Sequence, residues 1–125
     1  MRWIVDGMNV IGSRPDGWWR DRRAAIDALI VRLDRWAAAR GADVTVVFEQ
    51  PLNPPPVATT VRIAYAPRAS ANSADDEIVR LVSADAEPQD IRVVTSDRAL
   101  GERVIAAGAS VFPAARFRGE IDGVR

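Results

Sequence analysis

The segment D-V-T-V-V-F at residues 43–48 is the clearest indication of fold class in this sequence. It holds three valines and a phenylalanine within six residues, and its apolar side chains fall on both faces of an extended chain. A strand that is apolar on both faces is typical of a parallel sheet that helices cover on both sides. We therefore predict an α/β protein in which this stretch is a buried strand.

The segments on either side alternate between strand and helix patterns. Residues 2–5 are a short apolar run that ends at Asp6-Gly7, where we expect a strand followed by a loop. Between residues 20 and 40 apolar side chains recur at helical spacing, and Gly41 ends this helix. The same patterns predict strands over 61–65, 91–95 and 109–112, and helices over 73–84 and from Ser96-Asp97 to Gly108. Such alternation predicts a mostly parallel, five-stranded sheet with helices on both faces.

The length of 125 residues corresponds to one domain, and a hydrophobic fraction of 48% is enough for a core. Residues 51–56 are rich in proline and predict a stiff connecting loop. Residues from about 113 to 125 carry little pattern, and we expect a loosely ordered tail there. No apolar run approaches the roughly 20 residues of a membrane span, and cysteine is absent, so we expect a cytoplasmic protein with no membrane contact.

Three residue types are missing from the sequence, which contains no histidine, no cysteine and no lysine. Their absence excludes serine–histidine and cysteine–histidine catalysis, zinc sites of the usual nitrogen and sulfur type, and the phosphate-binding loop that needs lysine. Charge is balanced, with 17 acidic residues against 17 arginines. If this chain catalyses a reaction alone, carboxylates must carry the chemistry, with a hard cation held by oxygen ligands.

Three aspartates are expected at the same edge of the predicted sheet. Asp6 follows the first strand, Asp97 follows the fourth, and Asp75 begins the helix after the third. The carboxyl ends of parallel strands share one edge, where the ligands of α/β proteins usually bind. Carboxylates gathered in one crevice repel each other unless a cation neutralises them, and Mg²⁺ or Mn²⁺ suits carboxylate and water ligands. The pattern predicts a metal site that can hydrolyse a phosphate ester without histidine.

Helical spacing separates the neighbouring aspartates at positions 75 and 76. Asp75 lies on the same stripe as Ile78, on the apolar face that turns toward the sheet. Asp76 is rotated by about 100° from that stripe and faces the periphery of the site or solvent. Glu49, at the end of the second strand, approaches the cluster from the side. The candidate metal ligands are therefore Asp6, Asp75 and Asp97, with Asp76 and Glu49 as further candidates.

A structural role is the alternative explanation for these aspartates, because an Asp that precedes a helix is often its N-cap. Asp97 fits this alternative, since a helix follows it. Asp6 fits it less well, because Gly7 and Asn9 follow in a segment that does not obviously begin a helix. The coincidence of three aspartates at one edge favours a functional role.

The residues around these aspartates resemble three motifs of a known family. The segments are V-D-G-M-N-V-I at 5–11, S-A-D-D-E-I at 73–78 and V-V-T-S-D at 93–97. In order and spacing they are similar to the YacP-type NYN domains of the PIN-like nuclease superfamily, from about residue 3 to residue 112. The resemblance implies a single three-layer PIN-like domain over residues 1–125.

The resemblance also implies an endoribonuclease that needs Mg²⁺ or Mn²⁺ and cleaves single-stranded RNA, in some relatives mRNA at the ribosome. By matching position, Asp6, Asp75 and Asp97 are implied to bind the metal, and Asn9 to orient a water or the substrate phosphate. Ala99 is a departure, because broader NYN domains often carry a further acid at that place. This departure counts against a full two-metal site and leaves a single, tightly held ion as the alternative.

Several side chains near the predicted edge are candidates for contacting RNA. Arg98 is the best placed of the arginines, because it follows Asp97 directly, although each arginine alone also fits a solvated surface charge. Trp18 and its neighbour Trp19 can stack on unpaired bases, or anchor the entry to a helix against the core. The candidate RNA contacts are Arg14, Arg20, Arg23, Arg68, Arg98 and Trp18.

Two other functions are compatible with the same residues. A catalytically inactive RNA- or ribosome-binding module is favoured by Ala99 and by the balanced charge. A Mg²⁺-dependent phosphatase would use the same acids, but phosphatases of this architecture need a second Asp two residues after the first. Met8 occupies that place after Asp6, which makes the phosphatase the least favoured alternative.

Overall fold

The computed structural model of this chain describes residues 1–67 and 73–123, which form a five-stranded sheet with the strand order β3-β2-β1-β4-β5. Every neighbouring pair of strands is parallel. The strands are β1 (Arg2–Asp6), β2 (Asp43–Phe48), β3 (Arg62–Tyr65), β4 (Ile91–Val94) and β5 (Ser110–Phe112). The predicted α/β fold with a parallel sheet is confirmed, and β2 coincides with the valine-rich stretch that predicted it.

In the part of the chain that the structure describes, five α-helices and two short 3-10 turns accompany the strands. The helices are α1 (Gly7–Ile11), α2 (Arg22–Arg40), α3 (Ser73–Ala84), α4 (Arg98–Ala106) and α5 (Ala114–Asp122), and the 3-10 turns are η1 (Trp18–Arg20) and η2 (Pro88–Asp90). Helix α2 begins where the Asp21 carboxylate accepts a hydrogen bond from the Ala24 amide, and it ends at Gly41 with a φ of 62°. Within the described residues, no helix is long and apolar enough to cross a bilayer.

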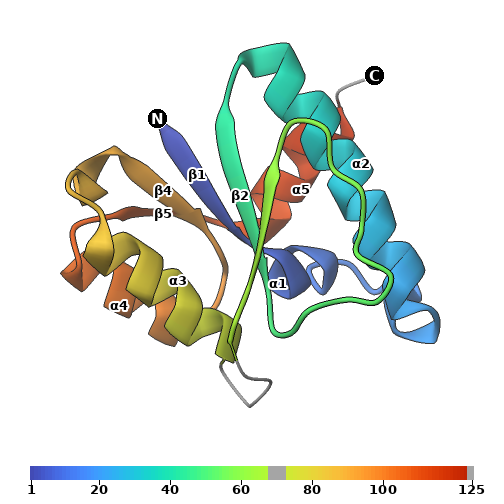
Figure 1. The fold of residues 1–125 in the computed structure, drawn as a ribbon, viewed down its shortest axis with the longest axis horizontal. Coiled ribbons are helices and arrows are strands. Elements are labelled where there is room, and N and C mark those ends of the chain that lie inside the picture. The colour runs from blue at the N-terminus through green and yellow to red at the C-terminus, as the bar shows by residue number, and fades with distance from the viewer. Residues whose placement is uncertain (68–72, 124–125) are drawn as a thin grey trace.

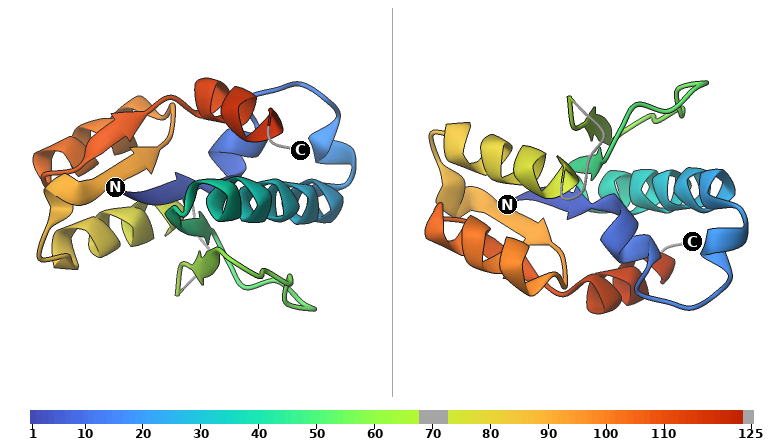
Figure 2. Two further views of the ribbon diagram at one scale, coloured as in Figure 1. Left: turned by 90° about the horizontal axis from the view of Figure 1, so that it is seen from above. Right: turned by 90° about the horizontal axis from the view of Figure 1, so that it is seen from below.

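The helices cover both faces of the sheet and give the protein three layers (Figure 1). Helices α2 and α5 pack on the face that carries Val5 and Val46, whereas α3 and α4 pack on the face that carries Ile4 and Val47. Figure 2 shows the same two layers from opposite directions, with the strands between them. Because successive side chains of a strand point to opposite faces, a run of valines supplies both cores at once.

Two expectations from the sequence are wrong. The segment after β1 is not a loop, because α1 begins immediately at Gly7. The expected tail over about 113–125 is also not loosely ordered within Ala114–Asp122, which forms α5. Phe117 and Ile121 of this helix are 0% and 1% exposed. The helix was missed because these two apolar residues stand in a polar, arginine-containing segment, and their burial depends on the aromatic side chains that the rest of the fold brings to them.

The strand order places a crevice at the centre of the carboxyl edge. From β1 the chain continues to β2 and β3 on one side, and later to β4 and β5 on the other. The carboxyl ends of β1 and β4 therefore flank the point where the strand order reverses, which is where ligands bind in open α/β sheets. Asp6 is the last residue of β1, and residues 95–97 follow β4.

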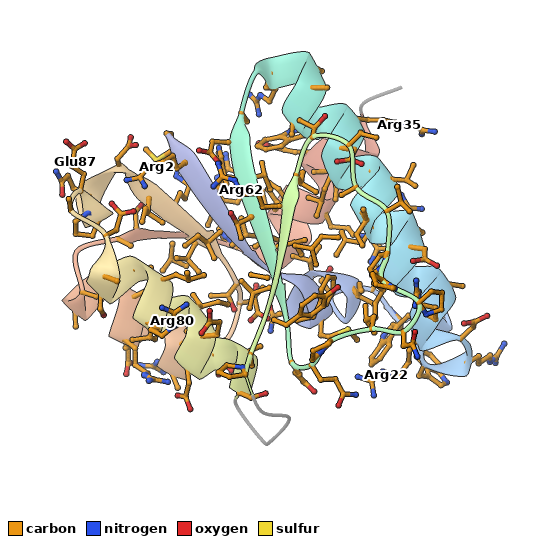
Figure 3. All side chains as sticks on the ribbon, viewed as in Figure 1. Arg2, Arg22, Arg35, Arg62, Arg80 and Glu87 are labelled. Carbon is orange, nitrogen blue, oxygen red and sulfur yellow. The ribbon has the colours of Figure 1, made fainter. Side chains whose placement is uncertain are left out.

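The opposite edge of the sheet is held together by Arg2. Its Nη1 donates to Asp85 Oδ2 at 2.6 Å, and its Nε donates to Asp90 Oδ2 at 2.9 Å. These bonds join the start of β1 to the connection between α3 and β4. Figure 3 shows Arg2 and Glu87 at this edge, away from Arg22 at the start of α2. The ion pairs of Arg2 thus stabilise the amino edge of the sheet, at the opposite end of the strands from the predicted site.

Candidate active site

Asp6 is the most buried of the acids at the carboxyl edge, with 6% of its surface exposed. Thr95 Oγ1 donates a hydrogen bond to Asp6 Oδ2 at 3.0 Å, across the boundary between β1 and β4. The Asp6 side chain makes no capping hydrogen bond with α1. The backbone N–H of Asn9 is still close enough to favour the charged form of the Asp6 carboxylate. Capping therefore does not explain this carboxylate, whose hydrogen-bond partner lies on the other side of the crevice.

A short polar network fixes the segment after β4. Thr95 Oγ1, while donating to Asp6, accepts a hydrogen bond from the Asp97 amide at 3.1 Å. Asn9 Oδ1 accepts a hydrogen bond from the Ser96 amide at 2.8 Å. Since the oxygen of the Asn9 side chain is used in this way, its Nδ2 group is the donor that remains for a ligand. Asn9 thus positions the Asp97 segment and keeps one polar group available.

Asp97 is both a helix cap and a wall of the crevice. Its Oδ1 accepts a hydrogen bond from the Leu100 amide at 3.0 Å, which makes it the N-cap of α4, as the structural alternative predicted. The same residue lines the crevice together with Asp6. A carboxylate has two oxygens, so a capping bond to one of them does not exclude a ligand at the other. Capping also fixes the orientation of the group.

The two neighbouring aspartates of α3 point in different directions, as helical spacing predicted. Asp75 is half-buried and lines the crevice. The Asp76 side chain is 68% exposed and accepts a hydrogen bond from Arg103 Nη1 at 2.9 Å. Ile78 of the same helix is 0% exposed in the core. Asp76 is therefore a surface residue, and Asp75 is the acid that α3 contributes to the crevice.

The crevice is a hollow of about 280 Å³, which we call the acid hollow. It is lined by Asp6, Met8, Asn9, Val47, Glu49, Ala74, Asp75 and Asp97. Five predicted side chains, from four separate segments of the chain, thus surround one space. Their roles in binding and catalysis stay predictions. Glu49 enters from the end of β2 with an exposed side chain, as a lateral member of the cluster.

Burial and mutual repulsion disfavour the charged forms of two of these acids. The pKa of Asp6 is raised to about 7: burial is the main cause, the charges of Asp75 and Asp97 add to the rise, and the hydrogen bond from Thr95 opposes it. Burial also raises the pKa of Asp75, to which Asp97 adds, while Arg103 acts in the opposite direction. A cation in the acid hollow would relieve this repulsion.

The donor set of the acid hollow fits Mg²⁺ or Mn²⁺, since every candidate ligand is a carboxylate oxygen. Among residues 1–67 and 73–123, no three acidic side chains lie in a ready-made cluster around one ion position. Mg²⁺ usually keeps several waters and contacts only one or two carboxylates directly. The arrangement therefore suits an ion that some of the acids reach through water.

The predicted RNA contacts fall in different places. Arg98 stands at the start of α4 with a side chain that is 94% exposed, and its Nε lies 3.5 Å from Glu102 Oε1. Arg23 lines a second hollow beside the acid hollow. Arg14 instead donates to Asp122 Oδ2 at 2.6 Å, on helix α5. The position of Arg68 lies outside the described residues.

The two tryptophans divide between the expected roles. Trp18 packs against the main core and lines a hollow formed with α2 and α5, separate from the residues of the acid hollow. Trp19 contacts it edge to face with ring centres 5.9 Å apart, and is 52% exposed. This geometry fits anchoring for Trp18 and leaves Trp19 as the accessible ring.

Sequence reasoning missed Thr95, which joins the two sides of the site. It is 1% exposed, and the sequence pattern assigned it to the fourth strand. A signal was available, because a hydroxyl at the end of an apolar strand and directly before Ser-Asp needs a buried hydrogen-bond partner. Its partner, Asp6, could not be identified until β1 and β4 were known to be adjacent.

With this geometry, comparison with known proteins identifies the family. The sequence matches the model of the YacP-like NYN domain family over residues 3–125. This chain belongs to that family. NYN domains are PIN-like members of a nuclease superfamily, so the NYN domain described here has a nuclease-like fold, and the resemblance noted in the sequence is confirmed.

The NYN domain is similar to two crystal structures of Rae1 (YacP) from Bacillus subtilis. One is 26% identical with a TM-score of 0.81, and the other, a tryptophan-to-leucine mutant, is 25% identical with a TM-score of 0.80. Each comparison covers 98% of this chain and 74% of the Rae1 chain. No curated protein matches the sequence.

Proposed function

We propose that this NYN domain is a metal-dependent endoribonuclease that hydrolyses phosphodiester bonds of single-stranded RNA. The observation that carries the proposal is the convergence of Asp6, Asp75 and Asp97 on one hollow at the point where the strand order reverses. Membership of a nuclease superfamily supports the reaction class. By the family resemblance, we extend the proposal to mRNA at the ribosome as the source of the RNA.

The residues of the acid hollow would have two roles in the reaction, metal binding and hydrogen bonding to the substrate or the attacking water. Asp6, Asp75 and Asp97 supply anionic oxygens that would hold a cation, directly or through water. The Asp97 carboxylate accepts a hydrogen bond from the Leu100 amide, and the Asp97 backbone amide donates one to the Thr95 hydroxyl. Because these bonds hold Asp97 in place, its carboxylate needs little reorganisation when a ligand binds. Asn9 Nδ2 can donate a hydrogen bond to a phosphate oxygen or to the attacking water.

The cofactor of this proposal is Mg²⁺ or Mn²⁺. Such an ion, when bound, lowers the pKa of a water for attack and neutralises charge that develops on the phosphate. No histidine is then required, in agreement with the sequence. The chain contributes the orientation of its carboxylates and the partial exclusion of solvent, since Asp6 is almost fully buried.

Asp75 and Asp76 offer a matched test, because they are neighbours in α3 and only Asp75 lines the acid hollow. Asp75→Asn should lower Mn²⁺-stimulated cleavage of single-stranded RNA by about 10²-fold or more, the usual effect of removing an electrostatic contact at a reacting centre. Asp76→Asn should leave cleavage nearly unchanged, since it breaks only an exposed ion pair with Arg103. Equal cleavage by both variants would reject the proposed site.

A second candidate function is an inactive RNA-binding module of the same fold. Two observations favour it: Ala99 in place of a further acid, and the lack of a ready-made cluster of three acids within the described residues. Calorimetric titration with Mn²⁺ separates the two functions. Saturable binding that Asp75→Asn weakens supports the nuclease, whereas RNA binding without any Mn²⁺ binding supports the module.

A further inference from the structure

A second hollow adjoins the acid hollow at the carboxyl edge. It has a volume of about 290 Å³ and lies between the start of α2, the end of β2 and the loop that follows β2. Met8 and Glu49 line both hollows, so the two spaces meet at these side chains. The other residues that line this second space, which we call the side hollow, are Arg22, Arg23, Ile26, Phe48, Gln50 and Leu52.

The side hollow combines an apolar lining with a polar rim. Its apolar residues are Met8, Ile26, Phe48 and Leu52. Gln50 and Glu49 are exposed at the rim, and an amide and a carboxylate can exchange hydrogen bonds with the edge of a nucleobase. A nucleobase has the same distribution, with apolar faces and a polar edge, and proteins bind unpaired bases through such surfaces.

Contacts within the protein fix the shape of the side hollow. The Phe48 ring can lie under α1 only because residue 7 is glycine: a Cβ at Gly7 would be 2.4 Å from Phe48 Cε1. The loop that carries Leu52 is tied to α2 at its far end, where the Asp34 carboxylate accepts hydrogen bonds from the backbone amides of residues 59–61, each at 3.0 Å. Because these contacts lie within the protein itself, they hold the walls of the side hollow in place, and little ordering is required on binding.

Two arginines place positive charge at the rim. The Arg22 guanidinium lies 5.8 Å from the centre of the Trp18 ring, and Arg23 Nε donates to Asp27 Oδ1 at 3.0 Å. Figure 3 shows Arg22 at the carboxyl-edge end of α2 and Arg35 at the other end of the same helix. Arginine forks suit the phosphates that flank a bound base, and they offset the acids of the neighbouring acid hollow.

We infer that the side hollow binds one unpaired nucleobase of RNA, adjacent to the phosphate that the acid hollow receives. The inference rests on the proposed function and deepens it. It proposes that the base next to the cleaved phosphodiester bond, held in the side hollow, determines which bond is cut. A base that occupies the side hollow must be unstacked, so double-stranded RNA is excluded. Leu52 and Phe48 make the base contact, and Arg22 contacts the backbone.

Binding of RNA to an Asp6→Asn background, which leaves the RNA uncut, tests this inference. The probes are a short abasic ribose–phosphate chain and the same chain carrying a single nucleobase, compared by fluorescence anisotropy. One base should raise affinity by about tenfold, within the range of one stacked base. Leu52→Ser should reduce this gain to about twofold or less, because it replaces the apolar wall with a hydroxyl.

Val57→Ser is the matched control, since Val57 lies in the same loop but is 85% exposed and does not line the side hollow. It should keep the full tenfold gain. Arg22→Gln should weaken binding of both probes and lower the salt dependence, and Arg35→Gln, at the far end of α2, should not. Thermal unfolding checks each variant, and Leu52→Ala replaces Leu52→Ser if the serine lowers stability.

The outcomes separate this inference from the proposed nuclease. Mn²⁺-dependent cleavage of ordinary single-stranded RNA by the unsubstituted protein is measured in parallel. Cleavage without any gain from the base, or an equal gain in Leu52→Ser and Val57→Ser, overturns the side hollow alone. A base-dependent gain without cleavage overturns the nuclease alone. No affinity for either probe together with no cleavage of RNA overturns both.

Discussion

Replacement of Asp6 by asparagine should stabilise the metal-free protein at neutral pH. In the folded protein burial raises the pKa of Asp6 to about 7, whereas an exposed Asp ionises near the usual value of 3.8. Folding therefore opposes ionisation of this group, and the folded state loses stability as pH rises between these two values. The introduced asparagine would carry no charge, and its side-chain oxygen can still accept the hydrogen bond from Thr95.

The size of the effect follows from the two pKa values. Each pKa unit corresponds to about 1.36 kcal/mol, so the raised pKa sets a ceiling of about 4 kcal/mol on the gain at pH 7.5. At pH 5 the folded group is already neutral while the unfolded group is mostly ionised, and the ceiling falls to about 2 kcal/mol. If Asp6 helps to hold Mn²⁺, the ion should stabilise the parent protein more than Asp6→Asn and so narrow the difference in stability between them at neutral pH.

Urea unfolding of both proteins, followed by tryptophan fluorescence at pH 5 and pH 7.5 in the presence of a chelator, measures this difference. Asp76→Asn is the control, because Asp76 is exposed and its replacement should change stability by about 1 kcal/mol or less at either pH. The reasoning is refuted if Asp6→Asn is no more stable than the parent at pH 7.5, or if its advantage fails to grow from pH 5 to pH 7.5.

Three further substitutions test the packing that supports the site. Gly7→Ala should lower the free energy of unfolding by about 1–3 kcal/mol, because the new methyl group would overlap the Phe48 ring. Gly119→Ala, in α5 with open space around it, should instead raise stability by about 0.5–1 kcal/mol, and thermal unfolding that ranks these two variants otherwise contradicts the packing argument. Phe117→Ala should cost about 3–5 kcal/mol, since the ring is fully buried with its centre 5.0 Å from that of Trp36, and a change near zero would show that α5 is not part of the core.

Much of the fold could be predicted from local patterns. The valine-rich stretch at 43–48 and the helix over Ser73–Ala84 have the bounds that the sequence predicted, because hydrophobic period and end signals are properties of short segments. Helix α1 was missed because five residues carry too little periodicity to distinguish a helix from a loop. Helix α5 was missed because Phe117 is buried by partners that are distant in the sequence, including Trp3 and Trp36.

The candidate site could be predicted in part. Helical spacing separated Asp75 from Asp76, and the structure places them as expected, one lining the acid hollow and the other exposed. The link from Asp6 through Thr95 to the Asp97 amide could not be predicted, since it needs β1 and β4 to be neighbours. The side hollow was also invisible in the sequence, because it depends on how the loop of Leu52 returns along α2.

The fold class, the candidate acids and the exclusion of histidine, cysteine and lysine chemistry follow from the amino-acid sequence alone, because composition and periodicity can be read from short segments of the chain. The folded structure was needed to show which acids line the same hollow, that the Thr95 hydroxyl joins Asp6 to the Asp97 amide, and that the side hollow lies next to them. Residues 6, 75 and 97 are far apart along the chain, and their meeting depends on the strand order and on the packing of α3, which bury Asp6 and raise its pKa. Burial and proximity, which distinguish these aspartates as a candidate site, exist only in the folded protein.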